Sequence, residues 1–150
     1  MSKKLKINGL STHSSLSEAA NVILKLRLTN LISDINKYFI ESTPENLHRI
    51  RISLRRLRYN LESFFICFET EKYLVFYKEI EKLQDLTGEL RDLDVLIDNI
   101  EKNFGKNEKF KFFKIKIENK REKILENLNL TLMEFLHSKC LKEFKKLFNR

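Results

Sequence analysis

Apolar residues recur every three or four positions along most of the chain, which is the period of a helix with one buried face. The first such stretch starts at Ser15, which has the spacing of a capping box with Glu18, and ends near Ile40. Its apolar positions are Leu16, Ala20, Ile23, Leu24, Leu31, Ile35 and Tyr38. We predict a helix over residues 15–40, preceded by a flexible tail, residues 1–14, that lacks this period.

A second apolar stripe begins after this first helix. Ser42 or Thr43 can cap it, and Pro44 suits its first turn, where a missing N–H costs nothing. The apolar positions are Ile50, Leu54, Leu57, Leu61, Phe64, Phe65 and Phe68. The pattern predicts a helix from Pro44 to near Phe68.

Two longer stripes follow, and a short one closes the chain. Thr70 can cap a third helix that runs to Gly105, a typical stop signal, and a fourth helix begins at about Asn107. Residues 109–117 alternate between charged and apolar side chains as a strand would, but the helical period continues beyond them. Residues 138–148 are predicted to form a last turn or short helix.

The composition agrees with helices throughout. The chain has three glycines, one proline and 42% apolar residues, and it shows no sustained strand-like alternation bounded by turn residues. Four amphipathic helices on short connections predict an all-α protein, an antiparallel four-helix bundle with a short C-terminal helix. We expect one domain over residues 15–150.

Several signals for secretion, membrane insertion and metal binding are missing from the sequence. Residues 1–15 contain no apolar signal-peptide core, and no apolar run is long enough to span a membrane. Cys67 and Cys140 have no neighbouring cysteine or histidine cluster. We therefore expect a cytoplasmic protein with no membrane partner, no disulfide, no cofactor and no metal site.

Positive charge is concentrated in the second helix. The chain carries 29 Lys and Arg against 21 Asp and Glu, a net charge of +8, and five arginines lie within residues 49–58, which contain no acidic residue. Like charges this close repel one another unless a counter-anion is present. We interpret the segment as an anion-binding one, and the alternative is an ordinary solvated face.

Helical geometry divides these charges into a stripe and a flank. Four residues spaced three, four and three positions apart share about one quarter of the helix surface: His48, Arg51, Arg55 and Arg58. The stripe lies about 100° from the centre of the apolar face and therefore borders the core. Arg49 and Arg56 flank it. Because guanidinium groups fork onto phosphate oxygens, phosphate is the natural ligand.

Further candidates lie in the third and fourth helices. Asp94 is at the edge of the apolar stripe near Arg91, and we expect it to pair with an arginine, here one of the second helix that it would orient toward the ligand. Gly88 inside a helix costs about 1 kcal/mol relative to alanine, which suggests a close approach of two helices. The fourth helix adds lysines that we expect, taken alone, to be solvated: Lys109, Lys116, Lys120 and Lys123.

At this point the sequence resembles the CHAD domain family, helical modules named for a conserved histidine and associated with polyphosphate binding. The resemblance rests on two motifs, His48-x-x-Arg51-x-x-x-Arg55-Arg56-Leu57-Arg58 and Gly88-x-x-Arg91-Asp92-x-Asp94-Val95. It implies a double four-helix bundle around a basic channel, of which this chain covers one half. Its motifs mix features of both halves, so we hypothesise a homodimer that rebuilds the double bundle.

The resemblance also implies roles for individual residues. His48, Arg51, Arg55 and Arg58 would contact phosphates of inorganic polyphosphate, with Asp94 as an orienting partner. Arg56 and Arg91 are weaker candidates by the same motifs, and Lys116 and Lys120 are further candidates from their position beside the apolar stripe of the fourth helix. The protein would then act in the cytoplasm, including at polyphosphate granules.

Two other function classes remain open. Some relatives carry a triphosphate-hydrolysing domain with a Glu-x-Glu-x-Lys motif, but here Glu79 and Glu81 are followed directly by Lys82, and on a helix the two carboxylates diverge by about 200°. There is no P-loop, HExxH or nucleophile elbow, so we expect no catalytic residue and no enzyme. Nucleic-acid binding is the main rival, because an arginine-rich helix attracts any phosphate backbone. An accessory module of phosphate or triphosphate metabolism, or a scaffold, is a further alternative.

Overall fold

The computed structural model describes residues 7–68 and 71–149, and within these ranges it contains helices and no strand. The elements are α1 (Leu16–Ile40), α2 (Pro44–Ser63), the 3-10 turn η1 (Phe65–Cys67), α3 (Glu71–Phe104), α4 (Glu108–His137), α5 (Lys139–Lys146) and the 3-10 turn η2 (Leu147–Asn149). The all-α prediction is confirmed. No helix in the described part of the chain is long and apolar enough to cross a membrane.

The local signals in the sequence set most helix starts. Ser15 and Glu18 form the predicted capping box of α1. Thr43 caps α2 by accepting the backbone N–H of Asn46, and Pro44 is the first helical residue. Asn107 caps α4, whose first turns are helical despite their strand-like alternation. The predicted cap of α3, Thr70, lies outside the described residues.

The end of α2 differs from the prediction. The helix stops at Ser63, not near Phe68, and the chain turns through η1. Apolar residues continue at helical spacing here, but they do not extend α2. Phe68 instead stacks on Tyr73 in the first turns of α3, with ring centroids 4.9 Å apart. The side chain of Ile66 is left 80% exposed. Packing against α3 therefore ends α2 earlier than its own pattern indicates.

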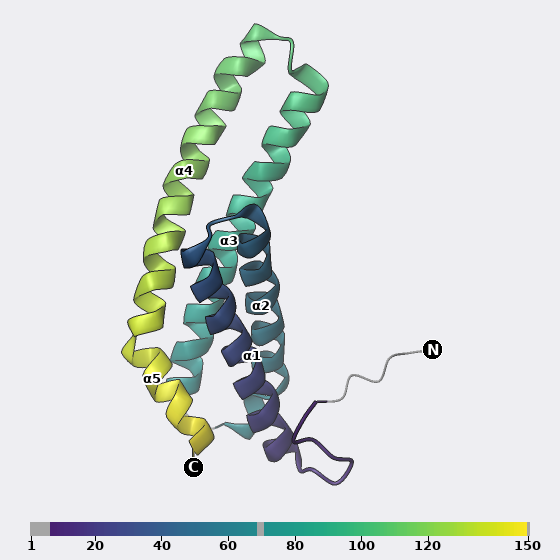
Figure 1. The fold of residues 1–150 in the computed structure, drawn as a ribbon, viewed down its shortest axis with the longest axis vertical. Helices are drawn as coiled ribbons and strands as arrows, with labels where there is room; N and C mark the ends of the chain where they lie inside the picture. Colours follow the sequence, from purple (N-terminus) through teal and green to yellow (C-terminus); the bar gives the residue numbers. More distant parts are fainter. Residues whose placement is uncertain (1–6, 69–70, 150) are drawn as a thin grey trace.

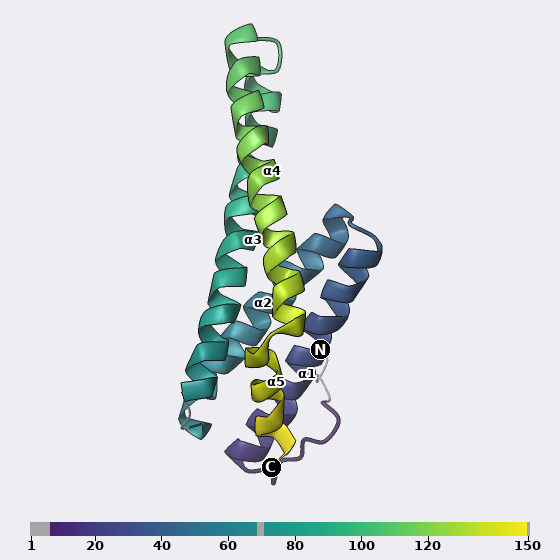
Figure 2. The same cartoon turned by 90° about the vertical axis from the view of Figure 1, so that its left-hand side faces the viewer.

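Two antiparallel helical hairpins make up the molecule. α1 pairs with α2, α3 pairs with α4, and α2 packs on α3 (Figure 1). In Figure 2 the α1–α2 pair is inclined to the α3–α4 pair, and α5 lies at the base, where it packs on α3. Since α3 and α4 are the longest helices, their hairpin extends well beyond the end of α1 and α2.

The hydrophobic core follows this shape. At the base, all five helices contribute to one large buried cluster, in which the rings of Phe76 and Phe144 stack with centroids 3.7 Å apart and both side chains are fully buried. In the projecting hairpin only two helices face each other. A small second cluster there contains Leu93, Ile100 and Ile117.

The segment ahead of α1 contains turns. Leu10 donates its N–H to the carbonyl of Ile7 at 3.2 Å, and Gly9 between them has a positive φ of 89° that suits glycine. The predicted tail, residues 1–14, extends beyond the described residues, so this prediction and the single domain over 15–150 stay predictions.

Candidate functional site

A groove runs between α2 and α3 and widens into two hollows. The first, which we call the Pro44 hollow, has a volume of about 110 Å³ and is lined by Pro44, Leu47, His48, Arg51, Thr87, Leu90, Arg91, Asp94 and Arg121. The second, the Gly88 hollow, is lined by Arg51, Arg55, Gln84, Asp85, Gly88, Glu89 and Asp92. Arg51 lines both hollows, so they form one continuous site, which we call the basic groove.

The buried face of α2 positions the α2 side of this groove. Ile50, Leu54 and Leu57 are fully buried and fix the rotation of the helix. His48, Arg51 and Arg55 then lie along the groove, as the predicted stripe requires. Within residues 7–68 and 71–149, no ion pair or hydrogen bond engages the guanidinium of Arg51 or Arg55. Both groups are therefore available to a ligand.

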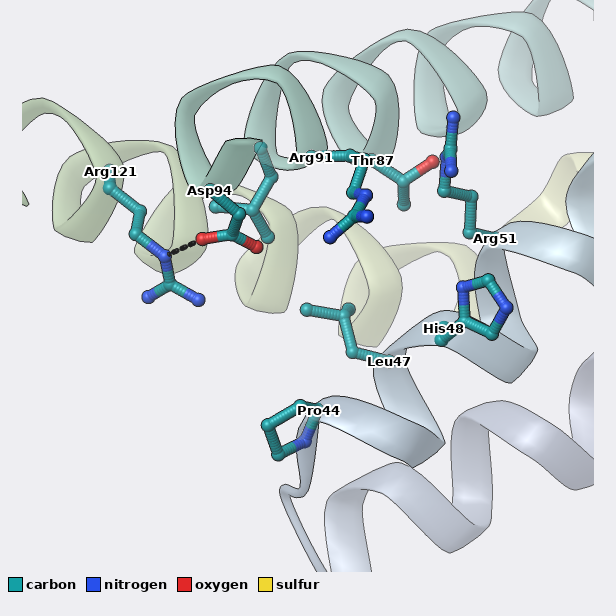
Figure 3. Close-up of a pocket in the computed structure, with 9 residues that line it drawn as sticks. Pro44, Leu47, His48, Arg51, Thr87, Arg91, Asp94 and Arg121 are labelled. Atoms are coloured by element: carbon teal, nitrogen blue, oxygen red, sulfur yellow. Dashed lines mark hydrogen bonds and ion pairs between the residues drawn. The ribbon is translucent and has the colours of Figure 1, made fainter. Parts of the chain in front are cut away.

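Arg91 completes the group of free cations from the opposite side. It projects from α3, and Figure 3 shows its guanidinium pointing into the space above Leu47. It too has no ion pair or hydrogen bond with the part of the chain that the structure describes. Two helices thus direct unpaired guanidinium groups at one hollow.

Arg58, the last member of the predicted stripe, has a different environment. Its Nε donates to Glu62 at 3.1 Å, and its Nη2 donates to Glu81 of α3 at 3.2 Å. Tyr77 and Gln84 accept weaker hydrogen bonds at 3.4 and 3.5 Å. The pKa of Arg58 is raised, mainly by the hydrogen bond with Tyr77 and then by that with Glu62. This guanidinium is already neutralised inside the protein.

Asp94 pairs with a residue that the sequence did not indicate. Its carboxylate accepts a hydrogen bond from Nε of Arg121, drawn as a dashed line in Figure 3. The expected partner on the second helix is wrong, because α4 lies closer to this edge of α3. The hydrogen bond with Asp94 is also the main reason that the pKa of Arg121 is raised.

A signal for Arg121 was nevertheless present in the sequence. Arg121 lies four residues after Ile117 and three before Ile124, so it occupies a position of the apolar stripe of α4. The charged end of an arginine at such a position must reach the edge of the core, where an acidic side chain can pair with it. The lysines that surround it in the sequence obscured this.

The comparison with protein families agrees with the resemblance seen in the sequence. A family model described as the CHAD domain matches residues 10–150. The chain belongs to the CHAD family. Membership supports a helical domain associated with polyphosphate and triphosphate. No curated protein and no solved structure matches the chain.

Besides Arg58, which lines neither hollow, three further candidate residues of this CHAD domain lie outside the basic groove. Arg56 is exposed and lines neither hollow. Lys116 lies over the ring of Phe112, with its Nζ 5.0 Å from the centroid. Lys120 extends toward α3 and reaches within 3.7 Å of Glu89, a residue of the Gly88 hollow. The structure thus brings together His48, Arg51, Arg55 and Arg91, and it leaves Arg56, Lys116 and Lys120 at the periphery.

Gly88 does not mark a close approach of helices, so that prediction is wrong. A Cβ atom built on Gly88 would meet no atom within 4 Å apart from its chain neighbours and the backbone of its own helix. The residue instead lies beside open space in the Gly88 hollow. Asp85, Glu89 and Asp92 line the same hollow, so the α3 side of the groove is acidic at this level while the α2 side is basic.

The two cysteines and the two remaining histidines lie away from the CHAD groove. Cys67 and Cys140 are free and half-buried, and burial raises the pKa of the Cys140 thiol to about 11. His13 and His137 are exposed and line neither hollow. Among residues 7–68 and 71–149 there is no group of three or more His, Cys, Asp or Glu that could hold a metal ion.

Proposed function

We propose that this CHAD domain binds inorganic polyphosphate in the basic groove and does not alter it chemically. One observation carries the proposal: Arg51 and Arg55 of α2 and Arg91 of α3 lie along one continuous groove with His48, and their guanidinium groups have no partner among the described residues. Uncompensated cations this close repel one another, so an anion that bridges them stabilises the folded arrangement.

The shape of the groove favours a linear anion with closely repeated charges. His48 and Arg55 are seven residues apart on α2, so the stripe between them is about 10 Å long. Arg51 lines both hollows, which lets one chain contact both of them. Each free guanidinium can donate two parallel hydrogen bonds to the oxygens of one phosphate group.

The acidic side of the Gly88 hollow supports polyphosphate over nucleic acid. Asp85, Glu89 and Asp92 lie across the groove from Arg51 and Arg55. A thin phosphate chain can follow the arginines of α2, whereas a broad duplex would also approach the carboxylates of α3. Repulsion of the wrong partner is a common source of specificity.

The experiment that tests this function removes the two free arginines of α2. We expect Arg51→Ala combined with Arg55→Ala to weaken binding of long-chain polyphosphate by about 100-fold or more, because each charge-assisted hydrogen bond contributes about 1.5–3 kcal/mol. Isothermal titration calorimetry at physiological ionic strength measures the affinity, and circular dichroism checks that helicity is unchanged. Gel analysis of the recovered ligand should show an unshortened chain.

The matched control removes the same charge from the same helix. Arg49 and Arg56 are exposed on α2 and line neither hollow, so Arg49→Ala combined with Arg56→Ala should weaken binding only slightly. An equal loss in both double variants would mean that net charge, not the groove, binds the ligand. Full affinity of the Arg51 and Arg55 double variant would place the site elsewhere.

A further inference from the structure

The positive charge of the basic groove is limited at both ends by carboxylates. At the C-terminal end of α2, Glu62 and Glu81 neutralise Arg58, and Gln84 contacts both Arg58 and the Gly88 hollow. A linear anion that follows Arg51 and Arg55 in this direction therefore meets a neutralised guanidinium flanked by two carboxylates.

The opposite end of the groove is acidic as well. Past Pro44 a further hollow continues from the Pro44 hollow, and the two share Pro44, Arg91, Asp94 and Arg121. The other residues that line it are Ile97, Asp98, Glu118, Asn119 and Glu122, which add no cation and three carboxylates, of which Glu118 pairs with Lys114 and Glu122 with Arg121. An anionic chain that extended beyond Arg121 would meet like charge, which is unfavourable.

Arg121 marks the boundary between these two regions. Asp94 holds its Nε, and Glu122 lies 3.8 Å from its Nη1. Its Nη2 has no ion pair or hydrogen bond with the residues that the structure describes, and the side chain lines the Pro44 hollow. α4 thus places a fixed donor at the point where the basic groove ends.

The last phosphate group of a linear chain suits such an end. Like a phosphate monoester, it has a second ionisable oxygen with a pKa of about 6, so it carries nearly two charges at neutral pH. An internal group has one ionisable oxygen. The Pro44 hollow gathers His48, Arg51, Arg91 and Arg121 around a single small space, with Asp94 paired to Arg121, so its cations match the nearly two charges of a terminal group better than the single charge of an internal one.

We propose that the Pro44 hollow receives the terminal phosphate group of a polyphosphate chain and that Arg121 binds it. This inference rests on the proposed function and deepens it, because it assigns the groove to chain ends. Arg51 then binds the following phosphate groups together with Arg55, and the chain leaves the protein before it reaches Arg58.

Phosphate compounds with and without ends test this directly. Linear triphosphate has two terminal groups, whereas cyclic trimetaphosphate has none and cyclic hexametaphosphate has none but carries more charge. We expect linear triphosphate to bind at least tenfold more tightly than either ring, as measured by direct calorimetric titration of each compound. Equal affinity for the linear and cyclic compounds would overturn the inference.

A matched pair of α4 variants assigns the effect to Arg121. Arg121→Gln should remove the preference for the linear compound, whereas Lys123→Gln, which removes one charge from an exposed position of α4 outside the hollows, should keep it. Arg121→Lys retains the positive charge but not the two-pronged guanidinium, and it should keep part of the preference. It serves as a second variant in case Arg121→Gln does not fold. A preference unchanged in both Arg121 variants would exclude Arg121 as the binding residue.

The long chain itself separates this inference from the proposed function. If the wild type binds long-chain polyphosphate but does not prefer linear triphosphate, only the recognition of chain ends is wrong. If it binds triphosphate but no long chain, the proposed polyphosphate function is wrong while the end site stands. If it binds neither, both are wrong.

Discussion

At the scale of single residues, Gly88 lowers the stability of its helix but lies in the proposed binding groove. Glycine in a helix interior is less stable than alanine by about 1 kcal/mol because the unfolded chain has more freedom. The structure offers no packing reason for it, since a Cβ atom would meet nothing within 4 Å apart from its chain neighbours and its own helix backbone. Its absent side chain leaves space in the Gly88 hollow, which Arg55 and Asp92 also line.

The first residue-scale prediction follows from this space. Gly88→Ala should raise the free energy of unfolding by about 1 kcal/mol, measured by urea denaturation. Gly88→Gln should fold as well as the alanine variant but fill the hollow and weaken polyphosphate binding. A destabilised alanine variant would show that the Cβ meets neighbouring atoms after all.

The sequence predicted which face of a helix a side chain lies on better than it predicted which residue that side chain would pair with. His48, Arg51 and Arg55 lie along the groove because the helical period alone fixes which residues share a face. The partners of Arg58 and Asp94 come from other helices, Glu81 from α3 and Arg121 from α4, and no spacing within one helix contains that information.

At the scale of elements, helix starts were predictable and one helix end was not. Caps such as Ser15 with Glu18 act through backbone groups a few residues away, so the signal is local. The end of α2 at Ser63 depends on the packing of Phe68 against Tyr73, a contact between elements. Apolar residues at helical spacing could not reveal it.

Arg58 joins two elements and is predicted to act in stability more than in binding. Its side chain connects α2 to Glu81, Tyr77 and Gln84 of α3. Arg58→Ala should lower the free energy of unfolding by about 1 kcal/mol, a partly exposed network being worth less than a buried one. Arg55→Ala, one turn away and unpaired in the described structure, should change it by less than about 0.5 kcal/mol.

For Arg55→Ala and Arg58→Ala, the order of the losses in polyphosphate affinity should be the reverse of the order of the losses in stability. Arg55→Ala should weaken polyphosphate binding more than Arg58→Ala does, because only Arg55 has a free guanidinium to offer. Unfolding curves and titrations of the same two proteins provide both comparisons. A stable Arg58→Ala variant with a large loss of affinity would identify Arg58 as a ligand-binding residue.

At the scale of the whole molecule, the projecting α3–α4 hairpin leaves apolar surface uncovered. With only two helices present, each stripe can be covered on one side alone. The exposed apolar residues of this region are Val95, Leu96, Phe104, Phe112, Phe113 and Ile115. Exposed apolar groups gathered in one region commonly mark an interaction surface.

We propose that two copies associate through this hairpin, since Lys109 and Lys111 on α4 and Asp98 on α3 are exposed and can complement each other across a twofold axis. Light scattering at micromolar concentration should give the mass of two 18.0 kDa chains. Phe112→Ser combined with Phe113→Ser should yield monomers, whereas Leu130→Ser, at an exposed site nearer the base of α4, should not. A monomeric wild type would remove this proposal.

The central claim, that the basic groove is a polyphosphate site, is tested most directly by competition. Labelled duplex DNA and long-chain polyphosphate, matched in total phosphate, are offered to the protein at moderate salt, and the displaced label is measured by fluorescence anisotropy. We predict that polyphosphate displaces the DNA and that DNA does not displace polyphosphate. DNA that binds more tightly would contradict the account and assign the free arginines to nucleic acid.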